Sequence, residues 1–441
     1  MLRRGFSGAL CVVALTLTAG VSTGAAAEKA IWGPVTLPSG GSAFPTYRDL
    51  GVDTYQYTLS WAAVAPQQPA DPGNPGDGAY RWPAELDQAV AAAAANRINV
   101  ALLVTRSPSW ANGGRSQIHA PDPGAYAQFV AAASRRYPSV RRWMIWGEPN
   151  RADRFQPNSA GGPESARAYA PILDAAYGAL KGVSRRNIVI GGMTWTGGDV
   201  KPAPFMKFMR LANGRPPRLD WFGHNPFPFR FPNLRELAIG GGFRDISDLD
   251  TFQRQLRRTY GKRARFWLSE FLVLSDRRSS TFELSVSRVD QARWLAAAYN
   301  IADSLDSVAG LGWFSLLDQP DRPGSSFWGL LTSSGQPKPA ARAFRRARSE
   351  RFRPGVSAPR RIRRATLAGR GLRVRVRPRA GGKVMVTLLR GSRRVSRSSR
   401  RVGGGKVARL RLRTRRPRTG RYLLAVQAPR GATVRRSVGV R

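Results

Sequence analysis

The sequence has few of the residues that most often bind metals or form covalent intermediates. Among 441 residues there is one cysteine, Cys11, and there are two histidines, His119 and His224. A single thiol excludes an internal disulfide framework and a zinc site built from cysteines. No glycine-rich nucleotide-binding turn follows the first strand-like segments either. We therefore expect neither a metal nor a cofactor.

Acidic residues are missing from the end of the chain. Residues 351–441 contain 30 Lys or Arg and no Asp or Glu, whereas residues 1–350 contain 42 basic and 27 acidic residues. Such a basic surface attracts polyanions, for example an anionic cell-envelope polymer. A general arginine bias would raise the basic count but would not remove the acids. Only Phe352 and Tyr422 are aromatic here, so base stacking, and with it specific nucleic-acid binding, is not expected.

Residues 1–27 have the composition of a secretory signal peptide. Arg3 and Arg4 precede an apolar run that is too short to span a membrane, and small residues at 25–27 suit cleavage. Cleavage would remove Cys11 with the signal. We expect a secreted, extracellular protein without a transmembrane segment, associated with the cell wall if its basic end binds the envelope.

Strand-like apolar runs alternate with helix-like segments between residues 28 and 350. The eight runs are Ala30–Val35, Thr54–Leu59, Asn99–Thr105, Trp143–Gly147, Ile188–Gly192, Leu219–Gly223, Arg265–Ser269 and Gly310–Leu316. Helical patterns lie between them at 82–97, 122–137, 163–182, 249–261 and 288–305. Eight units over roughly 300 residues are typical of a (β/α)₈ TIM barrel. A doubly wound α/β sheet is the alternative, but it would normally carry the glycine-rich turn.

The pattern changes after residue 350. A linker rich in Pro and Arg at 351–359 precedes short alternating runs at 360–441, such as "LRVRVRP" and "KVARLRLR", which glycine-rich turns separate. Alternation with a period of two indicates strands with one buried face and one solvent-facing face. We predict a small all-β, Ig-like sandwich domain without helices, whose arginines face solvent.

Two glutamates stand at the ends of predicted strands. Glu148 follows the fourth strand in "WMIWGEPN", and Glu270 ends the seventh in "RFWLSEF". Because a TIM barrel builds its active site at the carboxyl ends of its strands, we expect both to face one site. Paired carboxyl groups perform glycoside hydrolysis, in which one protonates the leaving oxygen and the other attacks the anomeric carbon. Either glutamate alone would more often be a surface or capping residue.

Candidate substrate-binding residues come from the same region of the barrel. Tryptophan rings offer flat apolar faces for sugars, and amides and imidazoles offer hydrogen bonds. Trp146 is expected to fill the barrel interior, since it should share a strand face with Glu148. His224 has an alternative role as a hydrogen-bonded structural residue. The candidates are His224, Asn225, Trp313, Trp110, Trp195, Gln56 and Asn150.

Taken together, these motifs resemble clan A of the glycoside hydrolases. "WMIWGEPN", "FWLSEF", "GLGWFSLLD" and "SPSWANGG", with "GLLTSSGQPKPAARAF", are similar to segments of the cellulase-like family 5 and the xylosidase-like family 39. The resemblance covers residues 30–345. It implies a carbohydrate substrate and a retaining double displacement, with Glu148 as the acid/base and Glu270 as the nucleophile.

Three positions depart from the clan pattern. Gly147 replaces the usual Asn that binds the sugar 2-hydroxyl, Gln56 replaces an Arg that holds the nucleophile, and Phe227 replaces a Tyr that contacts it. Glycine cannot make the 2-hydroxyl contact, which strengthens in the transition state. Either Asn225, Gln56 or another group compensates, the substrate differs at C2, or the enzyme is weak or inactive. The alternative function is a non-catalytic carbohydrate-binding or cell-envelope protein on a decayed hydrolase scaffold.

Overall fold

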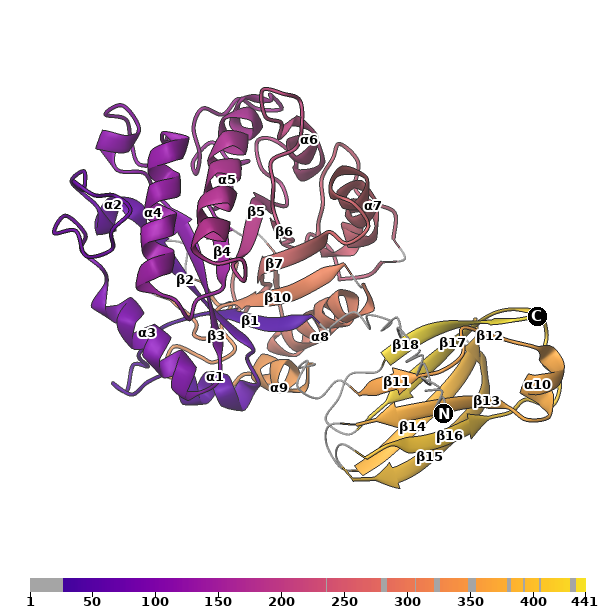
Figure 1. Cartoon of the computed structure of the whole chain (residues 1–441). Coiled ribbons are helices and arrows are strands. Elements are labelled where there is room, and N and C mark those ends of the chain that lie inside the picture. The colour runs from indigo at the N-terminus through magenta and orange to yellow at the C-terminus, as the bar shows by residue number, and fades with distance from the viewer. Residues whose placement is uncertain are drawn as a thin grey trace, which may run out of the picture.

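The computed structural model describes residues 27–234, 236–278, 284–305, 307–320, 326–347, 354–378, 382–391, 393–403, 406–428 and 434–441. The expected signal peptide and Cys11 lie outside these residues, apart from Ala27. No helix in the described part of the chain is long and apolar enough to cross a membrane. Figure 1 shows a barrel, coloured indigo to orange, and a C-terminal β-sandwich, coloured orange to yellow.

The first domain is a closed barrel of parallel strands in the order β1-β10-β7-β6-β5-β4-β3-β2. All eight strands fall on the predicted apolar runs, and the predicted TIM barrel is confirmed. Their bounds are β1 (Glu28–Trp32), β2 (Thr54–Ser60), β3 (Asn99–Thr105), β4 (Arg142–Ile145), β5 (Ile188–Trp195), β6 (Trp221–Asn225), β7 (Arg265–Phe271) and β10 (Val308–Phe314). A small sheet of β8 (Leu274–Ser275) and β9 (Ser285–Val286) follows β7.

Helices surround the barrel, and local signals fix where several of them begin. Asp122 accepts a hydrogen bond from the Ala125 N–H (2.8 Å) ahead of α4, and Ser287 accepts one from the Asp290 N–H (3.1 Å) ahead of α8. The five predicted helices are α3 (Ala84–Ala95), α4 (Pro123–Arg136), α5 (Glu164–Val183), α7 (Leu249–Tyr260) and α8 (Arg288–Ser304). The others are α1 (Phe44–Leu50), α2 (Trp61–Val64), α6 (Pro202–Phe208) and α9 (Pro339–Arg346), which are too short to show apolar periodicity.

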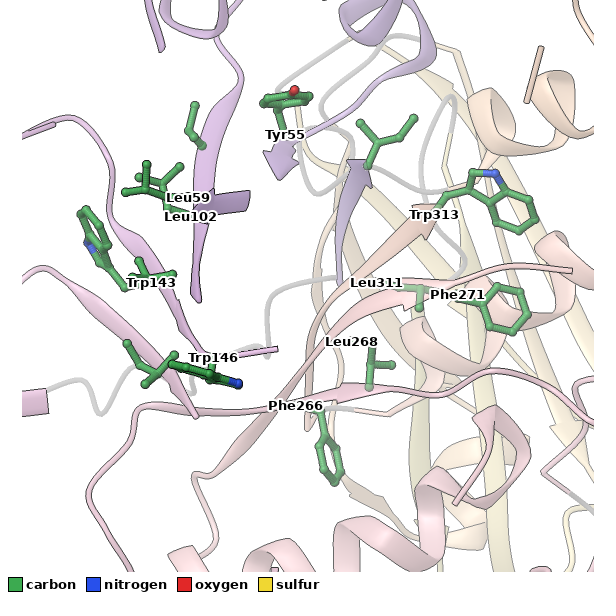
Figure 2. Close-up of a cluster of buried hydrophobic side chains, with 14 of the residues drawn as sticks. Tyr55, Leu59, Leu102, Trp143, Trp146, Phe266, Leu268, Phe271, Leu311 and Trp313 are labelled. Atoms are coloured by element: carbon green, nitrogen blue, oxygen red, sulfur yellow. The ribbon is translucent and has the colours of Figure 1, made fainter. Parts of the chain in front are cut away.

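The strands separate two apolar layers. The larger layer lies between strands and helices and contains Trp143 and Trp313, both of which Figure 2 shows. The smaller layer fills the barrel and contains Trp32, Met144 and Trp267. Large rings fit inside because β10 presents glycines there: a Cβ at Gly310 would lie 2.4 Å from the Trp267 ring, and one at Gly312 would lie 2.1 Å from the Ser269 carbonyl oxygen.

The second domain is the predicted all-β sandwich. One sheet has the order β11-β13-β16 and the other β12-β18-β17-β14-β15. Alternate residues of β13 and β16 are buried, which produces one core between the sheets. The strands are β11 (Gly355–Ser357), β12 (Arg361–Ile362), β13 (Leu372–Arg377), β14 (Gly382–Arg390), β15 (Arg393–Val402), β16 (Ala408–Leu412), β17 (Gly420–Gln427) and β18 (Val434–Val440).

Two details of this domain differ from the sequence prediction. A short helix, α10 (Arg364–Ala368), lies where no helix was expected, because five residues are too few to show a helical period. Strand β11 pairs with β13 inside the segment predicted as the linker 351–359. Its flanking Pro and Gly residues are turn signals that conceal a three-residue strand.

We predict that Gly312→Ala destabilises the barrel by about 2–3 kcal/mol, since the added Cβ would meet the backbone of β7. Gly182→Ala is the control, because α5 leaves open space there and alanine favours helix by about 0.5–1 kcal/mol. Denaturant unfolding followed by tryptophan fluorescence measures the barrel alone, since all 12 tryptophans precede residue 351. Equal midpoints for Gly312→Ala and the parent would contradict the packing argument.

Candidate active site

Glu148 follows β4 on a backbone turn that residues with a Cβ rarely adopt. Trp146 has φ 60° and Glu148 has φ 52°, both in the left-handed region. The Trp146 N–H donates to the Val104 carbonyl (2.9 Å) and the Glu148 N–H donates to the Met193 carbonyl (3.0 Å). Each such residue costs about 1–3 kcal/mol, and such strain clusters at functional sites. The turn therefore points to a function for the carboxylate that it places.

The same turn overturns the expectation for Trp146. Its ring packs against Tyr126 (6.2 Å between centroids) and Phe155 (5.3 Å), in the layer between strands and helices. The positive φ at Trp146 ends the regular alternation of β4, so Trp146 and Glu148 do not share a face as an extended strand would require. Figure 2 shows Trp146 with the other residues of this outer layer.

The Glu148 carboxylate is held by two donors. The Arg151 guanidinium donates to Oε2 (3.0 Å), and the Asn225 side-chain amide donates to Oε1 (3.0 Å). The Ser269 hydroxyl in turn donates to Asn225 Oδ1 (2.8 Å), which fixes the orientation of that amide. Arg151 also lies over the Trp195 ring, 4.8 Å from its centroid. Both donors stabilise a negative charge on Glu148.

A β-bulge places Glu270. Between Leu268 and Phe271, β7 has one residue more than the segment of β10 with which it pairs. Such a bulge turns side chains away from the faces that regular alternation would give them. Leu268 and Phe271 both remain in the outer layer, while Ser269 and Glu270 between them are released from strict alternation. A second bulge in β5 precedes Thr194 and contains Met193, which accepts the hydrogen bond from Glu148.

The pKa of Glu270 is raised to about 8, first because the surrounding protein shields its partly exposed carboxyl group from water and second because the charge of Glu148 repels its ionised form. The positive charges of Arg154 and Arg151 lower it by less. No described residue donates a hydrogen bond to this carboxylate. In the free protein at neutral pH, Glu270 therefore holds a proton, whereas Glu148 accepts hydrogen bonds from Arg151 and Asn225.

Two of the positions that depart from the clan pattern, Gln56 and Phe227, are buried. The amide of Gln56 bonds to β7: Nε2 donates to the Ser269 carbonyl (2.8 Å) and Oε1 accepts from Trp267 Nε1 (3.0 Å). Gln56 thus holds β7, and its contact with substrate stays a prediction. The ring of Phe227 is buried with Leu272 and carries no hydrogen-bond donor.

Strand alternation separates the two β6 candidates. Asn225 faces inward and contacts Glu148, as described above. His224 faces outward and is fully buried against Phe252, with Nε2 2.9 Å from the Arg244 carbonyl and Nδ1 2.9 Å from the Thr194 hydroxyl. Burial lowers the pKa of His224 to about 4, so the ring is neutral. The structure shows His224 in the structural role given as its alternative, and its contact with substrate stays a prediction.

Trp313 is also on the outer face of its strand. Its ring is fully buried with its centroid 5.9 Å from that of Phe271, and its indole N–H donates to the Trp328 carbonyl (3.1 Å). Figure 2 shows Trp313 and Phe271 together. Gly312 and Phe314 are the inward residues of β10, and the contact of Trp313 with sugar stays a prediction. Phe314 is partly exposed and packs against Trp32 (6.4 Å) and Trp328 (5.0 Å).

Two further predicted site residues, Asn150 and Trp110, differ in their exposure. Asn150 is fully buried and binds the β5 loop, with its amide bonded to the Trp195 N–H (2.8 Å), the Trp195 carbonyl (2.9 Å) and the Val200 carbonyl (2.9 Å). It therefore fixes a loop, and its contact with substrate stays a prediction. Trp110 is partly exposed, but it packs edge-on against Trp61 (5.4 Å) and donates to the Ala65 carbonyl (2.9 Å).

Three partly exposed aromatic rings lie over a small buried cluster. Trp195, Phe314 and Trp328 pack against the cluster of Phe227, Leu272 and Leu274. Trp195 also lies under Arg151, the residue that donates to Glu148. Of the three rings, Trp195 was a predicted site residue. Arg151, Ser269, Phe314 and Trp328 were not predicted; only Arg151 had a signal, its position three residues after Glu148. In the part of the chain that the structure describes, no group of three or more His, Cys, Asp or Glu residues could hold a metal ion.

The structure matches those of several glycosidases. It aligns with a family 39 glycoside hydrolase from Bacteroides cellulosilyticus WH2 at 17% identity, over 88% of this chain and 79% of that chain, with a TM-score of 0.55. The chain has the fold of the family 39 glycoside hydrolases. A monomeric β-xylosidase from Caulobacter crescentus CB15 gives 15% identity, 89% and 96% coverage and a TM-score of 0.53.

The structure also aligns with that of a glucosidase from Croceicoccus marinus at 14% identity, over 89% of this chain and 98% of that chain, with a TM-score of 0.53. The covered share exceeds the barrel, so the likeness extends into the β-sandwich. No protein-family model matches the sequence, and no curated protein matches it. The likeness therefore establishes the fold, and the chemistry has to be argued from the side chains.

The raised pKa of Glu270 predicts that this side chain destabilises the protein at high pH. The unfolded chain releases the proton near pH 4.5 and the folded chain only near pH 8, so stability falls as pH rises between these values. At pH 4, Glu270→Gln should therefore unfold at the same denaturant concentration as the parent. At pH 9 the variant should be more stable than the parent by on the order of 2 kcal/mol. This free energy is reduced to allow for the partial exposure of the Glu270 carboxyl group.

The control for this measurement is Glu164→Gln, an exposed glutamate in the first turn of α5. Its difference from the parent should be the same at both pH values. A Glu270→Gln difference that does not change with pH would contradict the assignment of a proton to Glu270.

Proposed function

We propose that the protein is a secreted retaining glycoside hydrolase that cleaves O-glycosidic bonds of a polysaccharide or oligosaccharide by double displacement. The observation that carries this proposal is the carboxyl pair. Glu148 follows β4 and Glu270 lies at the end of β7 in one barrel, and the two groups interact through their charges. The fold likeness to a β-xylosidase and a glucosidase supports it. Export is proposed from the signal-like composition of residues 1–27.

In this proposal Glu148 is the acid/base and Glu270 the nucleophile. Retaining hydrolysis requires one protonated and one ionised carboxyl group. In the free protein Glu270 holds a proton. The acid that protonates the leaving oxygen has to be Glu148, so the proton is on the other carboxyl group. The reactive form therefore arises when the proton passes from Glu270 to Glu148, and the positive charges of Arg151 and Arg154 favour the ionised nucleophile that remains. A reactive form that is a minor population gives a slow enzyme.

Substrate binding in this proposal relies on rings more than on a 2-hydroxyl contact. Gly147 offers no side chain, Gln56 is committed to β7, and Asn225 is committed to Glu148. Trp195, Phe314 and Trp328 remain partly exposed, and such faces stack on the apolar side of a sugar ring. We therefore expect the substrate to be selected by ring stacking, and to tolerate changes at C2 that clan members with the usual Asn reject.

The absence of a donor to Glu270 favours a second candidate, a non-catalytic carbohydrate-binding protein on the same scaffold. A carboxyl group that remains protonated cannot attack an anomeric carbon. In that case the parent protein and both glutamate variants would bind glycans with similar affinity, and none would release sugars.

Substitution of the two glutamates tests the proposed roles. On natural glycans, Glu148→Gln and Glu270→Gln should each lower kcat/KM by about 10³-fold. On a dinitrophenyl glycoside, whose leaving group needs no proton, Glu148→Gln should keep a parent-like first-turnover burst while Glu270→Gln stays inactive. Glu164→Gln is the control and should match the parent. The opposite pattern on the activated substrate would contradict the assignment of acid and nucleophile.

The pH dependence of kcat/KM gives an independent test. Below about pH 8 Glu270 holds the proton that the acid step requires, and above that pH Glu270 has lost it. Activity should therefore fall on the alkaline side with a midpoint near pH 8, and on the acidic side as the second carboxyl group is protonated. A profile that is flat from pH 7 to pH 10 would exclude a catalytic role for the shared proton.

A further inference from the structure

One face of the sandwich consists almost entirely of arginine. In the sheet β11-β13-β16 the inward residues are apolar, and the outward residues of β13 and β16 are Arg373, Arg375, Arg377, Arg409 and Arg411, here called the arginine face. All five are exposed. The antiparallel register places Arg373 directly opposite Arg411 and Arg375 directly opposite Arg409.

This arrangement sets like charges at short range. Residues two apart on a strand are separated by about 7 Å and neighbouring strands by about 5 Å, so each guanidinium has several positive neighbours. Like charges directly opposite each other destabilise a sheet. No Asp or Glu occurs in residues 351–441 to compensate them. An external anion would relieve the repulsion.

The arginines of the barrel are arranged differently, although the whole chain is rich in arginine. On the barrel surface Arg136 pairs with Asp87 (2.7 Å), Arg218 with Asp174 (2.7 Å) and Arg293 with Asp290 (2.9 Å). A general bias toward arginine would act on both domains, so it does not explain why acidic residues occur in residues 1–350 but not in residues 351–441.

Protection of sheet edges does not explain the arginine face either. Charged residues on an edge strand prevent pairing with other chains, and this accounts for the arginines of the edge strand β15. Strand β13, in contrast, is the central strand of its sheet and carries three of the five residues of the arginine face.

We propose that the arginine face binds an acidic polysaccharide, that is, a glycan with carboxylate or phosphate groups along its length. A regular grid of guanidinium groups fits a polymer with regularly repeated charges, each guanidinium being able to bind an anion in bidentate fashion. Aromatic residues are absent from the face, so it offers no platform for nucleobases. The choice of a glycan over a nucleic acid also rests on the proposed glycosidase function of the barrel.

The test measures binding of the full chain, carrying Glu270→Gln to prevent hydrolysis, to polygalacturonate over a series of salt concentrations. The triple variant Arg373→Gln, Arg375→Gln, Arg377→Gln should bind at least about tenfold more weakly, and its dependence of log Kd on log salt should be less steep by about 2, since each lost ionic contact removes roughly 0.7–0.9 from the slope. The triple variant Arg394→Gln, Arg400→Gln, Arg401→Gln on β15 removes the same charge and should stay within about twofold of the parent.

Four results would overturn the proposal: no binding of polygalacturonate by the parent, equal losses in the two triple variants, equal binding of methyl-esterified polygalacturonate, or tighter binding of a single-stranded DNA than of polygalacturonate. If the β13 variant does not fold, Arg409→Gln with Arg411→Gln tests the same face from β16. The readout is independent of catalysis. Hydrolysis is measured separately in the chain that keeps Glu270. If that chain hydrolyses glycans but polygalacturonate does not bind, this proposal fails and the glycosidase proposal stands. If polygalacturonate binds but no glycan is hydrolysed, the glycosidase proposal fails and this one stands.

Discussion

Ser269 joins four strands across the inside of the barrel. Its carbonyl accepts hydrogen bonds from Gln56 of β2 (2.8 Å) and from Trp32 of β1 (2.9 Å), and its hydroxyl donates to Asn225 of β6. Asn225 in turn donates to Glu148. Because Glu270 is the residue after Ser269, any shift of Ser269 would move Glu270 and the hydrogen-bonded support of Glu148 together.

The chemistry of the pair follows from which carboxylate receives donors. Arg151 and Asn225 both donate to Glu148, whereas the amide of Gln56 is bonded to Ser269 and Trp267 of β7. Burial then raises the pKa of Glu270. A proton on Glu270 is expected of either a slow hydrolase or a binding protein, and the pH dependence of activity distinguishes the two.

The sequence predicted the strands of the barrel because each is a continuous apolar run, and it located both glutamates because strand ends are visible as the point where such a run stops. It did not predict which strand-end side chains face inward. His224 and Trp313 lie one position from Asn225 and Phe314, and the face of each depends on registers and bulges between strands. The partners of Gln56 are more than 200 residues away, and no local pattern reveals them.

The composition of the sandwich also limits how its charge can respond to the surroundings. Residues 351–441 contain neither acidic side chains nor histidine. Asp, Glu and His are the side chains whose charge ordinarily changes between acidic and neutral pH. Over that range the side-chain charge of this segment is therefore fixed. Any acid-dependent release from a carboxylated polymer would have to come from protonation of the polymer, while added salt would act at every pH.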